Sequence, residues 1–190
     1  MGDIRRCTGM ILIGSDGRNS GKTELACAII RKFTPNHAIT AVKITTIHTR
    51  SKCPKGEQGC GVCGEVGDSF RILKEPAGGS HTDTSRLRDS GAKPVLWLQS
   101  RYSALPEALE SLVAHLTPDG LWLCESNSIR QFAIPDIFLL VRRDGRTSTK
   151  PSAKAVMGYA DRVVRSNGQF FDFSPDMLAI KNGMWVFHNS

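Results

Sequence analysis

Residues 10–30 read MILIGSDGRNSGKTELACAII, and this stretch decides the fold. An apolar run enters a Gly/Ser/Asn-rich turn that ends in Gly21-Lys22-Thr23, and a helical pattern of apolar residues follows at once. Strand, glycine-rich loop and helix in this order are the context that a phosphate-binding P-loop requires. Backbone N–H groups of such a turn, together with the helix N-terminus, attract phosphate. The stretch therefore predicts a nucleotide site.

The loop assigns roles to its polar residues. Lys22 is expected to reach the β- and γ-phosphates, and the Thr23 hydroxyl to ligate Mg²⁺. In the motif G-x-x-x-x-G-K-[ST], the first glycine falls where this chain has Asp16. The alternative is a glycine-rich β–α turn that holds Gly-Lys-Thr by accident. The expected nucleotide-binding residues are Gly17, Asn19, Ser20, Gly21, Lys22, Thr23 and Glu24.

Composition places the chain among globular domains. Its 190 residues suit one domain with a sizeable core, 40% of them are apolar and 23% are charged. The net charge of +7 suits a phosphate-rich ligand or an acidic partner. The basic residues are scattered and lack an aromatic stacking motif, which makes nucleic acid an unlikely partner. With no apolar N-terminal segment and no 18-residue apolar run, we expect a cytoplasmic protein away from membranes.

Apolar runs and helical patterns alternate along the chain. They predict a doubly wound α/β fold with a mostly parallel sheet, as one domain over residues 1–190. Residues 49–80 lack a sustained apolar period and are expected to form a Cys-rich insertion. Residues 1–7 are expected to be a polar lead-in, and residues 175–180 a short helix. The expected strands are 10–14, 38–45, 93–99, 120–124, 136–141 and 162–164. The first expected helix follows the loop and ends near residue 32, and the others cover 83–90, 105–116 and 154–159.

Three carboxylates lie where catalytic or binding groups are expected. Glu125 follows an apolar strand and is placed to hold Mg²⁺ opposite Thr23, unless it only caps the following turn. Asp144 ends Val-Arg-Arg-Asp, which has the layout of the guanine-reading Asn-Lys-x-Asp, although a solvated charged turn fits equally well. Asp83, at the start of the helix 83–90, is the best candidate for a water-positioning base.

The insertion holds Cys53, Cys60 and Cys63, with Cys60-x-x-Cys63 flanked by glycines. With His48 or His81 as a fourth ligand, these thiolates suit zinc, and alone they suit an iron–sulfur cluster. A redox pair of Cys60 and Cys63, or inert thiols, are the alternatives. The other three cysteines lie in apolar settings and are expected to be core thiols: Cys7, Cys27 and Cys124.

With these pieces assembled, the chain resembles the MobB family, the GTP-binding adaptor of molybdopterin-guanine dinucleotide biosynthesis. The loop GRNSGKT (17–23) is similar to that family's K-N-S-G-K-T, and AVKITTIH (41–48) to its V-x-x-I-K-H element. TDTSRLRDSGA (82–92) resembles its K-D-S-x-R-x-x-x-A-G-A helix, and the strand to Glu125 resembles its strand to an acidic residue. These places cover about half of the chain.

The resemblance implies a signal-recognition/MinD-type P-loop fold, a homodimer and GTP in preference to ATP. It implies a slow GTPase that assists molybdenum-cofactor biosynthesis together with a partner protein. Gly17 stands where such folds often carry a signature lysine. The cysteine segment keeps a metallochaperone GTPase open, since metal-insertion GTPases such as the hydrogenase nickel-insertion protein carry Cys/His sites. A small-molecule kinase and a nucleotide-binding adaptor with negligible turnover are further alternatives.

Overall fold

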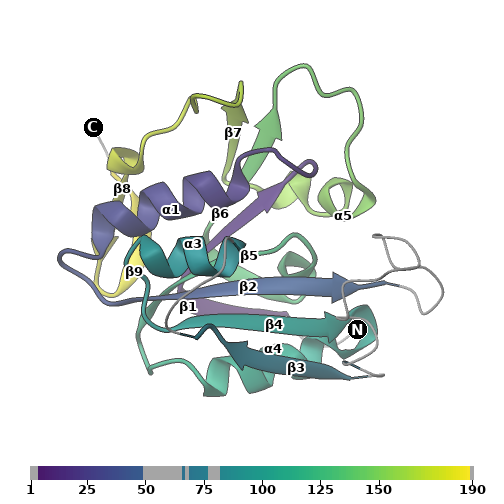
Figure 1. Ribbon diagram of the computed structural model, residues 1–190, viewed down its shortest axis with the longest axis vertical. Helices are drawn as coiled ribbons and strands as arrows, with labels where there is room; N and C mark the ends of the chain where they lie inside the picture. The colour runs from purple at the N-terminus through teal and green to yellow at the C-terminus, as the bar shows by residue number, and fades with distance from the viewer. Residues whose placement is uncertain (1–3, 49–65, 67–68, 77–81, 189–190) are drawn as a thin grey trace.

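The computed structural model describes residues 4–48, 66, 69–76 and 82–188 (Figure 1). Within these residues, seven strands form one sheet in the order β3-β4-β2-β5-β1-β6-β7. Its strands are β1 (Arg5–Ser15), β2 (Ile39–Ile47), β3 (Phe70–Lys74), β4 (Val95–Arg101), β5 (Leu121–Glu125), β6 (Ala133–Arg143) and β7 (Arg162–Ser166). The α-helices are α1 (Lys22–Phe33), α3 (Asp83–Asp89), α4 (Leu105–Ala114) and α5 (Pro151–Lys154). Neighbouring strands run parallel except β3, which is antiparallel to β4.

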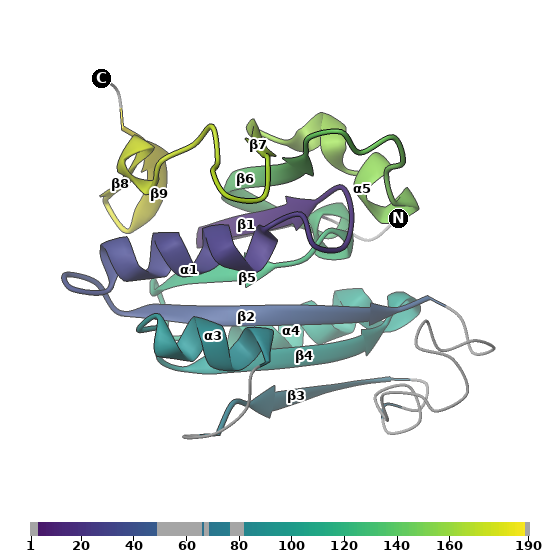
Figure 2. The ribbon, with the colours of Figure 1, turned by 45° about the horizontal axis from the view of Figure 1, so that its top comes forward.

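Helices cover both faces of the sheet because the central strands are apolar on both sides. In β1, Ile11 and Ile13 pack with α1 and α3, while Met10 and Leu12 pack with α4, and all four are fully buried. Figure 2 shows α1 and α3 on one side of β2 and β4, with α4 behind them. The expected doubly wound, mostly parallel α/β architecture is confirmed.

The connections bring several loops to one edge of the sheet. From β1 the chain passes through α1 to β2, skipping the position that β5 fills between them. β1 thus lies between β5 and β6, in register with both. Since the carboxyl ends of parallel strands meet at one edge, the loop after β1 is flanked by the ends of β5 and β6.

Two expectations about local structure are wrong. Residues 70–74, inside the segment expected to lack regular structure, form β3, because Phe70 and Ile72 alternate toward the core on the α4 side. The helix expected at 175–180 is a 3-10 turn (Pro175–Met177) followed by β8 (Leu178–Lys181), which pairs with β9 (Met184–Phe187).

The C-terminal hairpin forms because its turn residues suit it. Asn182 and Gly183 both have positive φ, as two-residue hairpin turns require. Trp185 is 1% exposed and meets Phe33 of α1 edge to face, with ring centroids 5.0 Å apart. Burial of this indole against α1 outweighs the weak helical pattern of the segment.

Two boundaries also differ from expectation. β1 begins at Arg5 rather than after a polar lead-in, because Cys7 turns inward to the core. The helix expected at 154–159 is divided into α5 and a 3-10 turn at Met157–Tyr159. Within the described residues, no helix combines the length and the apolar character that crossing a membrane requires.

Candidate functional site

The loop between β1 and α1 is shaped by two left-handed residues. Asn19 has φ 55° and Gly21 has φ 90°, and Gly21 is the residue that precedes the first turn of α1. A Cβ atom at Gly21 would lie 3.0 Å from the ring of Phe171, so glycine also suits the close approach of that loop. Lys22 and Thr23 consequently occupy the first turn, beside the loop's backbone N–H groups.

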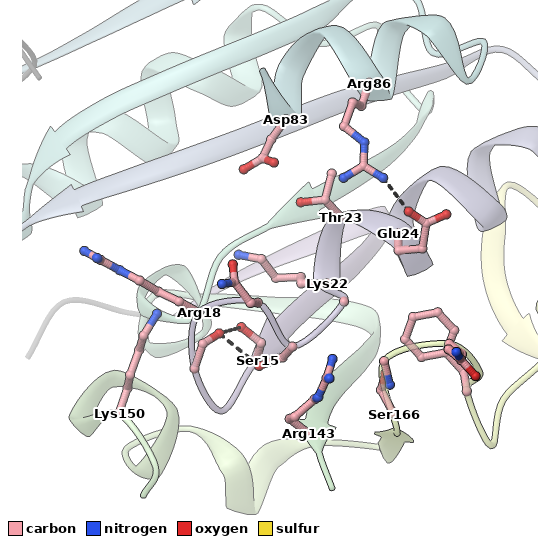
Figure 3. A pocket seen from close by; sticks show the side chains of 17 residues that line it. Ser15, Arg18, Lys22, Thr23, Glu24, Asp83, Arg86, Arg143, Lys150 and Ser166 are labelled. Carbon is pink, nitrogen blue, oxygen red and sulfur yellow. Dashed lines mark hydrogen bonds and ion pairs between the residues drawn. The ribbon is translucent and has the colours of Figure 1, made fainter. Parts of the chain in front are cut away.

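A cavity of about 480 Å³ opens over this loop (Figure 3). Most of its wall comes from the loop and from the start of α1. The rest comes from α3, from the last residues of β6 and β7 and from the segments that follow these two strands. All seven nucleotide-binding residues predicted in the loop contribute to this wall. Its lining comprises Ser15, Gly17, Arg18, Asn19, Ser20, Gly21, Lys22, Thr23, Glu24, Asp83, Arg86, Arg143, Lys150, Ser166, Gly168, Gln169 and Phe171.

Glu125 lies beneath the start of α1 and is fully buried. Its Oε2 accepts a hydrogen bond from the Thr23 hydroxyl at 3.2 Å and lies 4.0 Å from Lys22 Nζ. Among the described residues, its Oε1 has no hydrogen-bond partner. A buried carboxylate oxygen without a partner is costly, and a hydroxyl beside a carboxylate is the oxygen pair that Mg²⁺ prefers. Thr23 and Glu125 thus fit a magnesium ion.

Asp16, the residue that replaces the motif's glycine, fastens the loop to the end of β6. It is 1% exposed, accepts from Ser20 Oγ at 2.5 Å and from Arg143 N at 3.0 Å, and lies 3.6 Å from Arg146 Nε. Sequence reasoning treated this position only as a departure from the motif. The signal that could have indicated this role is a carboxylate four residues before a serine in a tight loop, where the two side chains can form a hydrogen bond.

Asn127 was also missed, and it holds the loop from the side of β5. Its Oδ1 accepts from Ser15 N at 2.8 Å, and its Nδ2 donates to Ser15 O at 2.9 Å. Nδ2 also lies 3.3 Å from Ser152 Oγ. Asp16 and Asn127 together satisfy polar groups at both flanks of the loop, which preorganises it.

Asp83 is brought to the cavity by α3, where it is the first helical residue after the Thr82 cap. Its carboxylate forms an ion pair with Lys43 of β2. Burial alone would raise the pKa of Asp83, but Lys43, followed by Lys22 and Arg86, lowers it below the ordinary value. Lys43 is in register with Glu125 of the neighbouring β5.

Glu24 and Asp144 lie farther from the centre of the cavity. Glu24 pairs with Arg86 and lies 3.7 Å from Arg31, which keeps its carboxylate at the rim. Asp144 is exposed in the turn after β6 and does not line the cavity, whereas the preceding Arg143 does. Guanine reading by Asp144 stays a prediction.

Most of the predicted metal ligands lie in parts of the chain that the structure does not describe. Cys53, Cys60, Cys63 and His81 lie outside the described residues. His48 is exposed and stacks on Tyr102, with ring centroids 5.2 Å apart. In the described part of the chain, no three His, Cys, Asp or Glu side chains are grouped as a metal site would need.

The other three cysteines are core thiols, as expected. Cys7, Cys27 and Cys124 are buried in the two apolar layers that flank the sheet. Burial raises the pKa of the Cys7 thiol to about 11 and also raises the pKa values of the Cys27 and Cys124 thiols. Protonated, enclosed thiols are poor nucleophiles and poor ligands.

Comparisons with protein-family models, with curated proteins and with solved structures found no match to this chain.

Proposed function

We propose that the protein is a P-loop nucleotide-binding protein that takes a nucleoside triphosphate with Mg²⁺ in the cavity above α1. The observation that carries this proposal is the buried Glu125 beside Thr23, with one carboxylate oxygen lacking a partner among the described residues. The left-handed Gly21 and the free end of α1 supply the N–H groups and the positive potential that phosphates need.

The residues divide the chemistry among themselves. Lys22 and the loop amides neutralise charge on the phosphates, and Thr23 and Glu125 hold the magnesium ion. That ion, when bound, shares the charge that develops on the transferring phosphoryl group. Asp83, with its pKa lowered chiefly through Lys43, is ionised at neutral pH and is the group that would orient an attacking water. With no other base named, we expect slow hydrolysis.

The finer assignment follows the resemblance set out above. We infer a slow GTPase of the signal-recognition/MinD-type class, acting as a homodimer with a partner protein in molybdenum-cofactor biosynthesis. The loop 17–23, residues 82–92 and the strand that ends at Glu125 support it. Residues of the loop and of α3 line the same cavity, and Glu125 accepts a hydrogen bond from Thr23 of that cavity. The zinc or iron–sulfur site at Cys53, Cys60, Cys63 and His48 belongs to the same proposal, and elemental analysis of anaerobically purified protein tests it.

Calorimetric titration with Mg·GTP tests nucleotide binding. Lys22→Ala is expected to weaken binding by roughly tenfold to a hundredfold, since it removes a charge-assisted contact to phosphate. Lys32→Ala is the matched control, because Lys32 carries the same charge in the last turn of the same helix. Equal affinity of the Lys22 variant and the control would refute the phosphate site, provided that circular dichroism shows both variants folded.

A further inference from the structure

The two ends of the cavity differ in chemistry. One end is formed by the last residue of β7 and the segment that follows it, and carries Ser166, Gly168, Gln169 and the ring of Phe171. At the other end lie Arg18 and Lys150, which approach each other on the far side of Lys22 from Ser166 (Figure 3). The aromatic and amide groups suit a nucleobase. With its base at the β7 end, a bound nucleotide would extend its phosphates along the loop toward Lys22.

Arg18 belongs to the phosphate loop, and Lys150 is fastened to that loop by its backbone. The carbonyl of Arg18 accepts from Arg146 Nη2 at 2.5 Å, and the N–H of Lys150 donates to the carbonyl of Asp16 at 2.9 Å. Arg146 is in turn held by the buried Asp16 carboxylate. The backbones that carry Arg18 and Lys150 therefore keep a fixed relation to the loop, although their side chains reach solvent.

Positive charge is concentrated at this end of the cavity. Among the described residues, neither Arg18 nor Lys150 has an ion-pair partner, while Arg146 is paired with Asp16. Partial burial, followed by the charges of Lys22, Arg18 and Arg146, lowers the pKa of Lys150, and the Asp16 carboxylate opposes this more weakly. Such crowding of like charges is unfavourable, and an anion placed among them would relieve it.

The phosphates of the nucleotide do not need the positive charges of Arg18 and Lys150. In the proposed function, the loop amides, Lys22 and a magnesium ion on Thr23 and Glu125 already neutralise the triphosphate. The side chains of Arg18 and Lys150 lie past Lys22 on the side away from Ser166, where the terminal phosphate would point (Figure 3). A planar guanidinium beside a flexible ammonium matches a dianion such as a phosphate monoester.

We propose that Arg18 and Lys150 form a second anion site that binds the phosphate group of a phosphorylated ligand next to the terminal phosphate of the nucleotide. This inference rests on the proposed function, because it takes the bound nucleotide as the neighbour of the site. The ligand class is therefore a phosphorylated small molecule that shares the cavity with the nucleotide.

A linear guanosine 5′-tetraphosphate tests the site, because its fourth phosphate extends past the position of the third. Calorimetry with Mg²⁺ at constant ionic strength compares its affinity with that of GTP. The wild-type protein is expected to bind the tetraphosphate about tenfold more tightly than GTP, as contacts between charged groups allow. The double variant Arg18→Ala/Lys150→Ala is expected to abolish that advantage.

Lys154→Ala/Arg165→Ala is the matched control, since it removes two exposed positive charges that do not line the cavity. It is expected to keep the tetraphosphate advantage. Equal affinities of the wild-type protein for the two nucleotides, or an equal loss in the control, would overturn the anion site while leaving nucleotide binding intact. A wild-type protein that binds neither nucleotide would instead refute the proposed function, and the anion site with it.

Discussion

Two strands flank β1, and each has a carboxylate at or just after its carboxyl end, yet the two carboxylates have opposite surroundings. Glu125 ends β5, in register with Ile13 of β1, and is fully buried beside Thr23. Asp144 lies one residue beyond β6 and is exposed, with its N–H bonded to Ser166 O at 2.9 Å. The sequence predicted a binding role for both, with a solvated turn as an equal alternative for Asp144.

The difference follows from where the sheet stops controlling side-chain direction. Leu121 and Leu123 face α1, so the two-residue period of β5 turns Glu125 toward α1 as well. Asp144 is outside the ladder of β6 and precedes Gly145, which has φ 72°. A strand-end residue inherits the facing of its strand only while it remains paired, and Arg143, still within β6, is the residue that reaches the cavity.

Glu125→Gln should produce the largest effect, because the change removes a buried charge and keeps the shape of the side chain. We expect Mg²⁺ to strengthen GTP binding to the wild-type protein by roughly tenfold to a hundredfold and to leave the variant's affinity nearly unchanged. Calorimetric titrations with Mg²⁺ and with EDTA measure this difference. If the variant keeps the full magnesium dependence, Glu125 is a structural carboxylate and no metal ligand.

Asp16 extends the comparison to a buried carboxylate that sits in the loop itself. Asp16→Gly restores the motif's glycine, but it removes an acceptor of Ser20 Oγ and Arg143 N and leaves Arg146 unpaired. We expect the free energy of unfolding to fall by about 2 kcal/mol in urea denaturation. Asp144→Gly adds the same backbone freedom at an exposed site and should cost less than about 1 kcal/mol. Equal losses in the two variants would mean that the Asp16 contacts add nothing.

The sequence predicted what depends on periodicity and on local motifs. The residues 10–30 gave the strand, loop and helix, and Glu125 and Asp83 were both expected near the loop that they border. The sequence did not predict the features that contacts between distant residues determine. Asp16 is fixed by Arg143 and Arg146, and β8 and β9 are stabilised by Trp185 against Phe33. The two partners of each contact are far apart in the sequence, so a local pattern around one of them does not reveal the other.

The exposure of Asp83 is intermediate between those of Glu125 and Asp144, since its side chain is 44% exposed. Its pKa should therefore respond to its ion-pair partner Lys43. Lys43→Met is expected to raise the pKa of Asp83, because burial then opposes the charged form with less compensation. With the pKa depressed, the pair adds stability above about pH 3.8 and loses it as the pH falls below that value. Carboxyl-carbon NMR measures the shift, with Lys154→Met as a control that should leave Asp83 unchanged.

The smallest effect is expected at Asp144, where the comparison began. An exposed carboxylate outside the cavity is screened by solvent, so Asp144→Asn should change the ratio of GTP to ATP affinity by less than about twofold. Gln169 lines the cavity and can both donate and accept, so Gln169→Ala should change that ratio by about threefold or more. Competition titrations that include xanthosine triphosphate decide between them. A strong gain for xanthosine triphosphate in the Asp144→Asn variant would show that this carboxylate turns inward to read guanine, and the contrast with Glu125 would then fail.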